Sequence, residues 1–323
     1  MYNLKLYGLE RKPDQKLLFI GPYVGSWGHL FHFHIPIVNR LRERNPDIFI
    51  VSAGFIGDDF YYKDDKGKMT IDAYIEFPTD PDVRRVYGLS QANHADDIKR
   101  ADKICEEHYG PININLKTPT HDSAWFKFLS QMARTHYRLG LFAEPANDSN
   151  YVVLHSKNAR GLADRDPRGT PIANADYETD VEYVRLLSQH VKIYICGIPN
   201  ECYTFEGENV VDITGLSAEE RPRVLLPLTN EALCMVSTSS GSTANYAMSV
   251  GCPSICFACR RYRDNYDTKY NHYRVPTRHH VLFPFDAEKR VEDTLDFLES
   301  IKDKPRYECE ILRLDTDLTS KWL

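Results

Sequence analysis

Short apolar runs alternate with amphipathic stretches along most of the chain, which is the pattern of repeated strand-then-helix units. The first run, 16–21 (KLLFIG), ends in glycine, and a glycine-bearing loop separates it from a stretch that places Ile35, Val38 and Leu41 on one helical face. A second apolar run follows at 47–54. Strands that alternate with helices in this way predict parallel sheets covered by helices, and hence an α/β fold.

The alternation stops at a loop rich in breaker residues, 144–150 (EPANDSN), and starts again with an apolar strand at 151–155 (YVVLH). A loop of that composition is typical of a linker between two folded halves. We therefore expect an N-terminal domain at 1–147, a C-terminal domain at 148–304 and a tail at 305–323.

The composition is that of an ordinary globular protein, with 323 residues of which 42% are hydrophobic and 27% charged, so the disordered and coiled-coil classes are excluded. No apolar run approaches the ~18 residues of a membrane helix, and the first residues lack the pattern of a signal peptide. Eight scattered cysteines form no dense disulfide framework, which favours a cytoplasmic location. A net charge of −6 excludes a globally basic nucleic-acid-binding surface but allows a local basic patch.

The most informative segment is 232–258, where an apolar strand runs through a loop of small and hydroxyl residues directly into a helix. Backbone N–H groups of such a loop can approach a ligand closely, and the helix N-terminus favours negative charge. The hydroxyls can donate to phosphate oxygens, although any one of them could simply cap the helix. We predict a phosphate-binding loop because the run is longer than capping requires. Its residues are Ser239, Ser240, Gly241, Ser242 and Thr243.

Around this loop, the segment 151–258 resembles the C-terminal domain of the GT-B glycosyltransferase superfamily, and of heptosyltransferases within it. The run 193–201 (IYICGIPNE) resembles the strand-Gly-x-x-Glu segment of these enzymes, and 209–215 (NVVDITG) resembles a later strand. Residues 239–253 resemble the nucleotide-diphosphate loop, its helix and a Gly-x-Pro turn. The resemblance implies two Rossmann-like domains that face each other across a cleft, with the 305–323 tail crossing back to the N-terminal domain.

The same resemblance implies that a nucleotide-sugar binds to the C-terminal half, with its diphosphate against the 239–243 loop. Lys157 and Arg160 follow the first strand of this half and are placed to neutralise the leaving diphosphate. Gly197 and Glu201 lie at the end of the central strand, near the expected nucleoside.

A loop after the first strand of the N-terminal half resembles the first loop of GT-B enzymes, many of which place Gly-His there. Its residues are Gly25, Ser26, Trp27, Gly28 and His29. The resemblance implies that His29 is the base that deprotonates an acceptor hydroxyl, a task that suits the pKa of histidine. A packed histidine at a helix start is the alternative. Asp58 is the second candidate base, or with Asp59 a partner that orients His29, and exposed turn acids are the alternative for this pair.

We therefore expect a metal-independent glycosyltransferase, of the hexosyl- or pentosyltransferase type, that uses a nucleotide-sugar and no further cofactor. Its acceptor could be a polyanion such as modified DNA or a glycan, because the stretch 259–280 combines basic and aromatic residues. A surface loop whose tyrosines pack on the domain is the alternative for this stretch. Its basic residues are Arg260, Arg261, Arg263, Lys269 and Arg274.

Two other functions remain open from the sequence. One is a nucleotide-sugar 2-epimerase, although the glutamate pair of such enzymes aligns with Asn245 and Tyr246 here, which argues against it. The other is a catalytically silent module of the same fold that binds a nucleotide or a polyanion.

Two further spacings match metal motifs. Cys252-x3-Cys256-x2-Cys259 has the spacing of an iron–sulfur motif, and His32-x-His34 has that of a metal-binding pair. We expect the cysteines to lie in a buried strand and the histidines to flank the start of a helix, because that is where the local pattern places them.

Overall fold

The fold is known from a computed structural model of the chain. The structure describes residues 2–8, 10–24, 30, 34–64, 66–77, 95–117, 149–156, 177–198, 202–238, 246–247, 250–257, 279–282 and 286–303. Within these ranges, no helix is long and apolar enough to cross a membrane.

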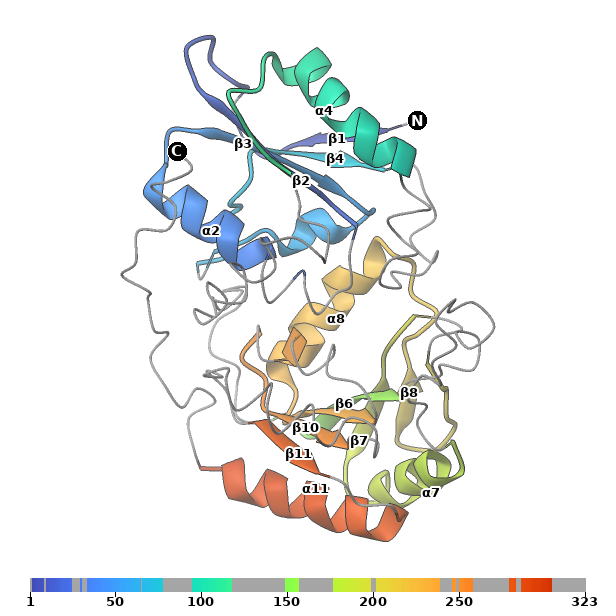
Figure 1. The fold of residues 1–323 in the computed structure, drawn as a ribbon. Helices are drawn as coiled ribbons and strands as arrows, with labels where there is room; N and C mark the ends of the chain where they lie inside the picture. The colour runs from blue at the N-terminus through green and yellow to red at the C-terminus, as the bar shows by residue number, and fades with distance from the viewer. Residues whose placement is uncertain are drawn as a thin grey trace. The chain divides into compact units, whose positions relative to one another are not determined.

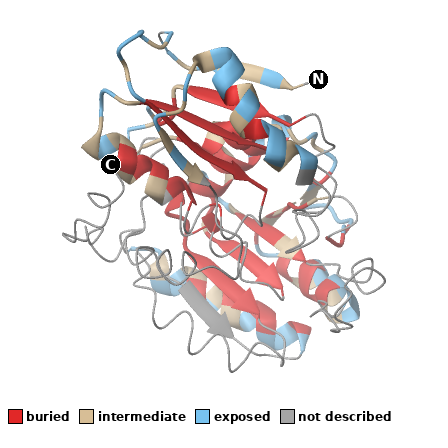
Figure 2. Ribbon diagram, turned by 45° about the horizontal axis from the view of Figure 1, so that its top comes forward, coloured by how far each residue is buried: buried red, intermediate tan, exposed pale blue. Residues whose placement is uncertain are grey.

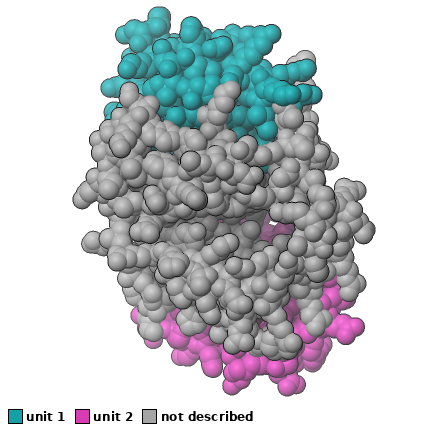
Figure 3. Space-filling view, in the orientation of Figure 1, with its two compact units in different colours: residues 1–141, 218–223, 311–323 teal, residues 142–217, 224–310 magenta. Residues whose placement is uncertain are grey.

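The chain forms two compact units, each with its own sheet and hydrophobic core (Figure 3). Unit 1 takes the chain up to residue 141 together with 218–223, and unit 2 takes 142–217 and 224–310. The domain boundary expected after residue 147 and the tail expected at 305–323 lie outside the described residues, so both stay predictions.

The sheet of unit 1 has the strand order β1-β4-β3-β2-β5 (Figure 1). β2 to β5 are parallel, and β1 pairs antiparallel with β4 at one edge. The chain moves outward from β2 to β4 and then returns past β2 to β5, so the order reverses between β2 and β5. In open α/β sheets, such a reversal marks the crevice where ligands bind at the carboxyl ends of the strands. The strands are β1 (Asn3–Leu6), β2 (Leu17–Tyr23), β3 (Phe49–Gly54), β4 (Ala73–Glu76) and β5 (Ile114–Lys117).

Helices cover both sides of this sheet (Figure 1), because the connection from β2 outward to β3 and the connection back from β4 to β5 cross it in opposite directions. The predicted apolar face of the first helix is confirmed, since Ile35, Val38 and Leu41 are all buried. Pro36 lies in its first turn, where a missing N–H is tolerated. The helices are α2 (Ile35–Arg44), α4 (Ala95–Tyr109) and the short 3₁₀ helix η2 (Asp58–Tyr61).

The sheet of unit 2 is parallel throughout, with the order β11-β10-β9-β6-β7-β8. The order reverses between β6 and β9, which lie side by side in the middle of the sheet. Figure 2 shows the inner strands of both sheets buried, whereas the edge strands β1 and β8 carry only intermediate and exposed residues. The strands are β6 (Tyr151–Ser156), β7 (Lys192–Ile195), β8 (Val210–Asp212), β9 (Met235–Thr238), β10 (Ser254–Phe257) and β11 (His279–Leu282).

Two helices of unit 2 pack against each other below the sheet (Figure 1), and the Tyr183 hydroxyl lies 2.9 Å from that of Thr294 between them. Asp286 caps the second of these helices, since its side chain accepts from the backbone N–H of Lys289 at 2.7 Å. The helices are α7 (Tyr177–Leu187), α8 (Glu220–Glu231) and α11 (Ala287–Ile301); the first turn of α8 belongs to unit 1.

One prediction about the basic stretch 259–280 is corrected. Its last two residues, His279 and His280, are strand residues of β11 that pair with β10 and are not part of a loop. The basic residues Arg260, Arg261, Arg263, Lys269 and Arg274 lie outside the described residues.

Candidate functional site

The reversal of strand order in unit 2 brings two predicted donor segments to neighbouring strands. Ser156 is the last residue of β6 and Thr238 the last residue of β9, and the two are register partners. The chain leaves β6 toward Lys157 and Arg160, and it leaves β9 toward the 239–243 loop. These residues, and Glu201, lie outside the described part of the chain, but the strand ends that precede them meet at the expected ligand crevice.

A buried carboxylate links these two strand ends. Asp180, in the first turn of α7, is fully buried. One of its oxygens, Oδ2, accepts from both the Ser156 hydroxyl and the Thr238 hydroxyl, the latter at 2.6 Å. Its other oxygen, Oδ1, accepts from Nη1 of Arg290 on α11 at 2.6 Å.

The charge of Asp180 is balanced where it is buried. Burial raises the pKa of its carboxyl, while the hydrogen bonds from Ser156 and Thr238 and the charge of Arg290 oppose that rise. The site therefore places no uncompensated negative charge at the ends of β6 and β9.

Gly197 follows β7 in a backbone conformation that favours glycine, with a φ of +149°. A Cβ at this position would lie 2.6 Å from Sγ of Cys202 and 3.2 Å from Cδ2 of His155. The glycine thus allows the chain after β7 to approach the end of β6. Its predicted place near a nucleoside stays a prediction.

Gly197→Ala is expected to lower the free energy of unfolding by about 2–4 kcal/mol, because it combines backbone strain with overpacking against Cys202. The measurement is urea unfolding of both proteins. Gly215→Ala is the control, since nothing lies within 4 Å of an added Cβ there, and it should change stability by less than about 0.5 kcal/mol. Equal stability of the two variants would contradict this reading of Gly197.

The adjacent acids Asp58 and Asp59 are buried, so the alternative that they are exposed turn acids is wrong. Asp58 and Asp59 lie in η2, directly after β3, and are 2% and 5% exposed. Asp58 therefore lies at the carboxyl end of the sheet, where ligands of α/β sheets bind. Its role as a catalytic base stays a prediction. Gly25, Ser26, Trp27, Gly28 and His29 lie outside the described residues.

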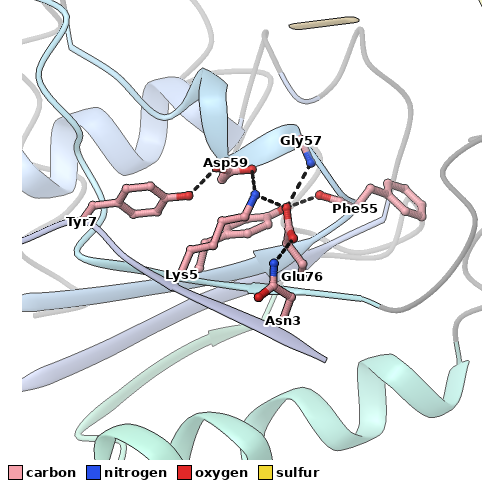
Figure 4. Close-up of polar contacts among 8 residues, drawn as sticks. Asn3, Lys5, Tyr7, Phe55, Gly57, Asp59 and Glu76 are labelled. Carbon is pink, nitrogen blue, oxygen red and sulfur yellow. Dashed lines mark hydrogen bonds and ion pairs between the residues drawn. The ribbon is translucent and has the colours of Figure 1, made fainter. Parts of the chain in front are cut away.

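A network of polar side chains surrounds Asp59 and Glu76 at this end of the sheet (Figure 4). Glu76, the last residue of β4, accepts from Nδ2 of Asn3 at 2.7 Å, from the backbone N–H of Gly57 at 3.2 Å, and from Lys5. Nζ of Lys5 also lies 3.1 Å from Oδ1 of Asp59, and the Tyr7 hydroxyl donates to Asp59. One lysine therefore bridges two buried carboxylates.

The charges in this network are fixed by their neighbours. Burial lowers the pKa of Lys5, but hydrogen bonds and charges from Glu76 and Asp59 outweigh it and raise the pKa overall. Burial raises the pKa of Tyr7, and the negative charges of Asp59 and Glu76 raise it further. Lys5 is therefore a cation and Tyr7 a neutral donor at neutral pH.

Lys5→Met is expected to destabilise the protein by about 2–3 kcal/mol, because it keeps the aliphatic stem but leaves two buried carboxylates without their cation. Lys103→Met is the matched control, since its pairing with Glu107 at 3.6 Å is exposed and should contribute less than about 0.5 kcal/mol. Chemical denaturation measures both. A loss no larger than that of the control would show that the network contributes little.

His34 is a packed residue at the start of α2, as the helix-start interpretation predicts. It is buried between Tyr23 and Tyr62, whose ring centroids lie 5.0 and 5.7 Å from that of the imidazole. Burial lowers the pKa of His34 to about 3, so the ring is neutral at neutral pH. His32 lies outside the described residues.

The expected strand placement of the cysteine motif is confirmed for Cys256 alone, because Cys252 lies two residues before the strand begins. Cys252 and Cys256 are fully buried, and Cys256 belongs to β10. Cys259 lies outside the described residues. Across the described ranges, no group of three or more His, Cys, Asp or Glu side chains could hold a metal ion.

The residues that complete both networks were not predicted from the sequence. Asp180 lies on the same helical face as the apolar Val184 and Leu187, and an acid on such a face indicates a buried, paired charge. Asn3, Lys5 and Tyr7 recur at every second position, which is the period of a strand with one polar face. Both signals are present in the sequence, but neither indicates the partner.

Comparison with solved structures supports the same architecture. The chain is similar to E. coli heptosyltransferase WaaC with ADP, at 10% identity over 88% of this chain and 99% of that chain, with a TM-score of 0.53. WaaC with ADP-2-deoxy-2-fluoro heptose has the same identity and coverage and a TM-score of 0.51. A glycosyl transferase family 9 protein from Veillonella parvula shows 12% identity over 88% of this chain and 93% of that chain, with a TM-score of 0.48. No family model matches the sequence, and no curated protein matches it.

The chain therefore has the fold of the GT-B glycosyltransferases, with two Rossmann-like units. This confirms the α/β class and the GT-B resemblance predicted from the sequence. At 10% identity, the similarity establishes the fold and leaves the activity to be argued from the site.

Proposed function

We propose that the protein is a glycosyltransferase that moves a sugar from a nucleotide-sugar donor to an acceptor hydroxyl. The observation that carries the proposal is the meeting of β6 and β9 at the reversal of strand order in unit 2, directly before the 157–160 segment and the 239–243 loop. Parallel α/β sheets bind nucleotides at this point. The GT-B fold, and the ADP bound by the similar WaaC, support a nucleoside diphosphate there.

In this proposal the donor's diphosphate lies against Ser239, Ser240, Gly241, Ser242 and Thr243. Backbone N–H groups and hydroxyls donate to its oxygens, and the following helix adds its N-terminal dipole. Lys157 and Arg160 balance the charge that develops on the leaving diphosphate. Gly197 and Glu201 lie toward the nucleoside.

The acceptor approaches from unit 1, where the 25–28 loop leaves room and His29 is the general base. His29 takes the proton of the acceptor hydroxyl, whose oxygen attacks the anomeric carbon. The bond from that carbon to the diphosphate breaks, and its electron pair leaves on the diphosphate oxygen. The reaction needs no bound metal, because cationic side chains and backbone N–H groups stabilise the leaving group. A polyanionic acceptor, such as a glycan or modified DNA, would be held by the basic residues of 259–280.

The proposal is tested by incubating the protein with ADP-, UDP-, GDP- and dTDP-linked sugars and a mixture of glycan and hydroxymethylated-DNA acceptors. We expect acceptor-dependent release of one nucleoside diphosphate, unchanged by EDTA. Conversion of UDP-GlcNAc without an acceptor would instead identify an epimerase, and nucleotide binding without turnover of any sugar would identify a silent binding module.

A further inference from the structure

Three neighbouring strands of unit 2 end in register with one another. Ser156 of β6 is the register partner of Thr238 of β9, which in turn is the partner of Phe257 of β10. All three are buried. Residues 157, 239 and 258 follow them directly in the sequence, so whatever holds these three strand residues also sets where the next segments of the chain begin.

One ion pair holds all three strand ends. Oδ2 of Asp180 accepts from both hydroxyls, so the ends of β6 and β9 are joined through a single carboxylate oxygen. Arg290 donates to Oδ1 of the same carboxylate, and its guanidinium carbon lies 5.5 Å from the centroid of the Phe257 ring. Arg290 therefore connects the end of β10 to the other two.

Further side chains of α7 and α11 surround and contact the ion pair. The Thr294 hydroxyl donates to the backbone carbonyl of Arg290 at 2.7 Å and lies 2.9 Å from the Tyr183 hydroxyl. The Tyr183 ring packs edge-on against Phe257, with centroids 5.5 Å apart. Two helices and three strand ends thus form one connected cluster of side chains.

A buried ion pair contributes little to the net stability of a protein, because burying two charges opposes folding. Apolar side chains of similar volume often stabilise the folded protein as well or better. Two features of the Asp180–Arg290 ion pair fit a ligand site instead. Oδ2 of the carboxylate accepts from the last residues of β6 and β9, on either side of the reversal of strand order, and Arg290 cancels a negative charge that would otherwise repel an anion bound nearby.

We propose that Asp180 and Arg290 are positioning residues for the donor, because they fix the ends of β6, β9 and β10. They thereby fix where the two segments that are proposed to contact the diphosphate, 157–160 and 239–243, begin. The inference rests on the proposed function, because it assumes a nucleoside diphosphate at this crevice. Positioning of this kind acts on affinity through geometry, since loops that start from fixed points lose less freedom when they bind.

The test compares nucleotide affinity with stability in two variants of one residue. Thr238→Val keeps the shape of the side chain but loses the hydrogen bond to Asp180, whereas Thr238→Ser keeps the hydroxyl but loses a methyl group. We expect Thr238→Val to weaken binding of the nucleoside diphosphate that the wild type prefers by about tenfold, and Thr238→Ser to stay within about twofold.

Asp180→Asn should weaken binding at least as much as Thr238→Val. Glu182→Gln, which disturbs only an exposed pair with Arg185 on the same helix, should bind like the wild type.

The outcomes separate the two proposals. If the wild type binds no nucleoside diphosphate, the proposed function fails. If the wild type binds one and folded Thr238→Val binds it equally well, the positioning role is overturned. The same holds if Thr238→Ser, which loses packing, weakens binding more than Thr238→Val. Ser156→Ala gives the equivalent comparison on β6 should Asp180→Asn fail to fold.

Discussion

Replacement of His29 by alanine is expected to lower the rate of sugar transfer by about 10²–10⁴-fold, because the acceptor hydroxyl loses the group that takes its proton. The affinity for the nucleotide should remain within about twofold of the wild type, since His29 belongs to the acceptor side of the proposed site. The measurement is kcat under saturating donor, together with the Kd of the nucleoside diphosphate.

Two controls make the His29 result specific. His190→Ala changes an exposed histidine of unit 2 after α7 and should leave kcat unaltered. Asp58→Asn tests the second candidate base, and a larger loss there than in His29→Ala would assign the proton transfer to Asp58. Full activity of His29→Ala would remove this histidine from the mechanism.

The combination Ser240→Phe and Gly241→Val is expected to weaken nucleotide binding by at least 100-fold, because bulky side chains would occupy the space that backbone N–H groups need to reach the phosphates. The unliganded protein should unfold at nearly the same denaturant concentration as the wild type, since both positions belong to the predicted loop 239–243. Titration calorimetry and urea unfolding measure the two quantities.

Gly215→Val is the matched control for the phosphate loop, because it adds the same side chain where nothing lies within 4 Å of a new Cβ. It should bind nucleotide like the wild type. Unchanged affinity in the Ser240/Gly241 variant would disprove the assignment of the phosphate loop.

Much of the fold could be predicted from the sequence because parallel strands are buried on both faces and read as continuous apolar runs. β2 and β3 are buried at every position, and both were expected. The edge strand β1 was missed because it has only four residues, none of them buried, and so lacks a continuous apolar run. β4, with four residues, and β11, which follows a basic stretch, offered no local pattern of sufficient length.

The site could be predicted only where its residues are adjacent in sequence. The 239–243 loop is a local pattern, so it could be recognised without a structure. Asp180 and Arg290 lie 110 positions apart, and Lys5 and Glu76 lie 71 apart. No local rule pairs such residues, because their meeting depends on how the strands are ordered in each sheet. The burial of Asp58 and Asp59 has the same origin, since η2 follows a strand in the middle of the sheet.

The most direct test of a nucleotide site where β6 and β9 meet is the denaturant stability of the wild-type protein with UDP, GDP, ADP, CMP and dTDP in turn. A nucleotide present at 100 times its Kd should stabilise the unit that binds it by about 2.7 kcal/mol. We expect one of the nucleoside diphosphates to give this effect and the Ser240/Gly241 variant to abolish it. No stabilisation by any of the five would contradict a nucleotide site where β6 and β9 meet.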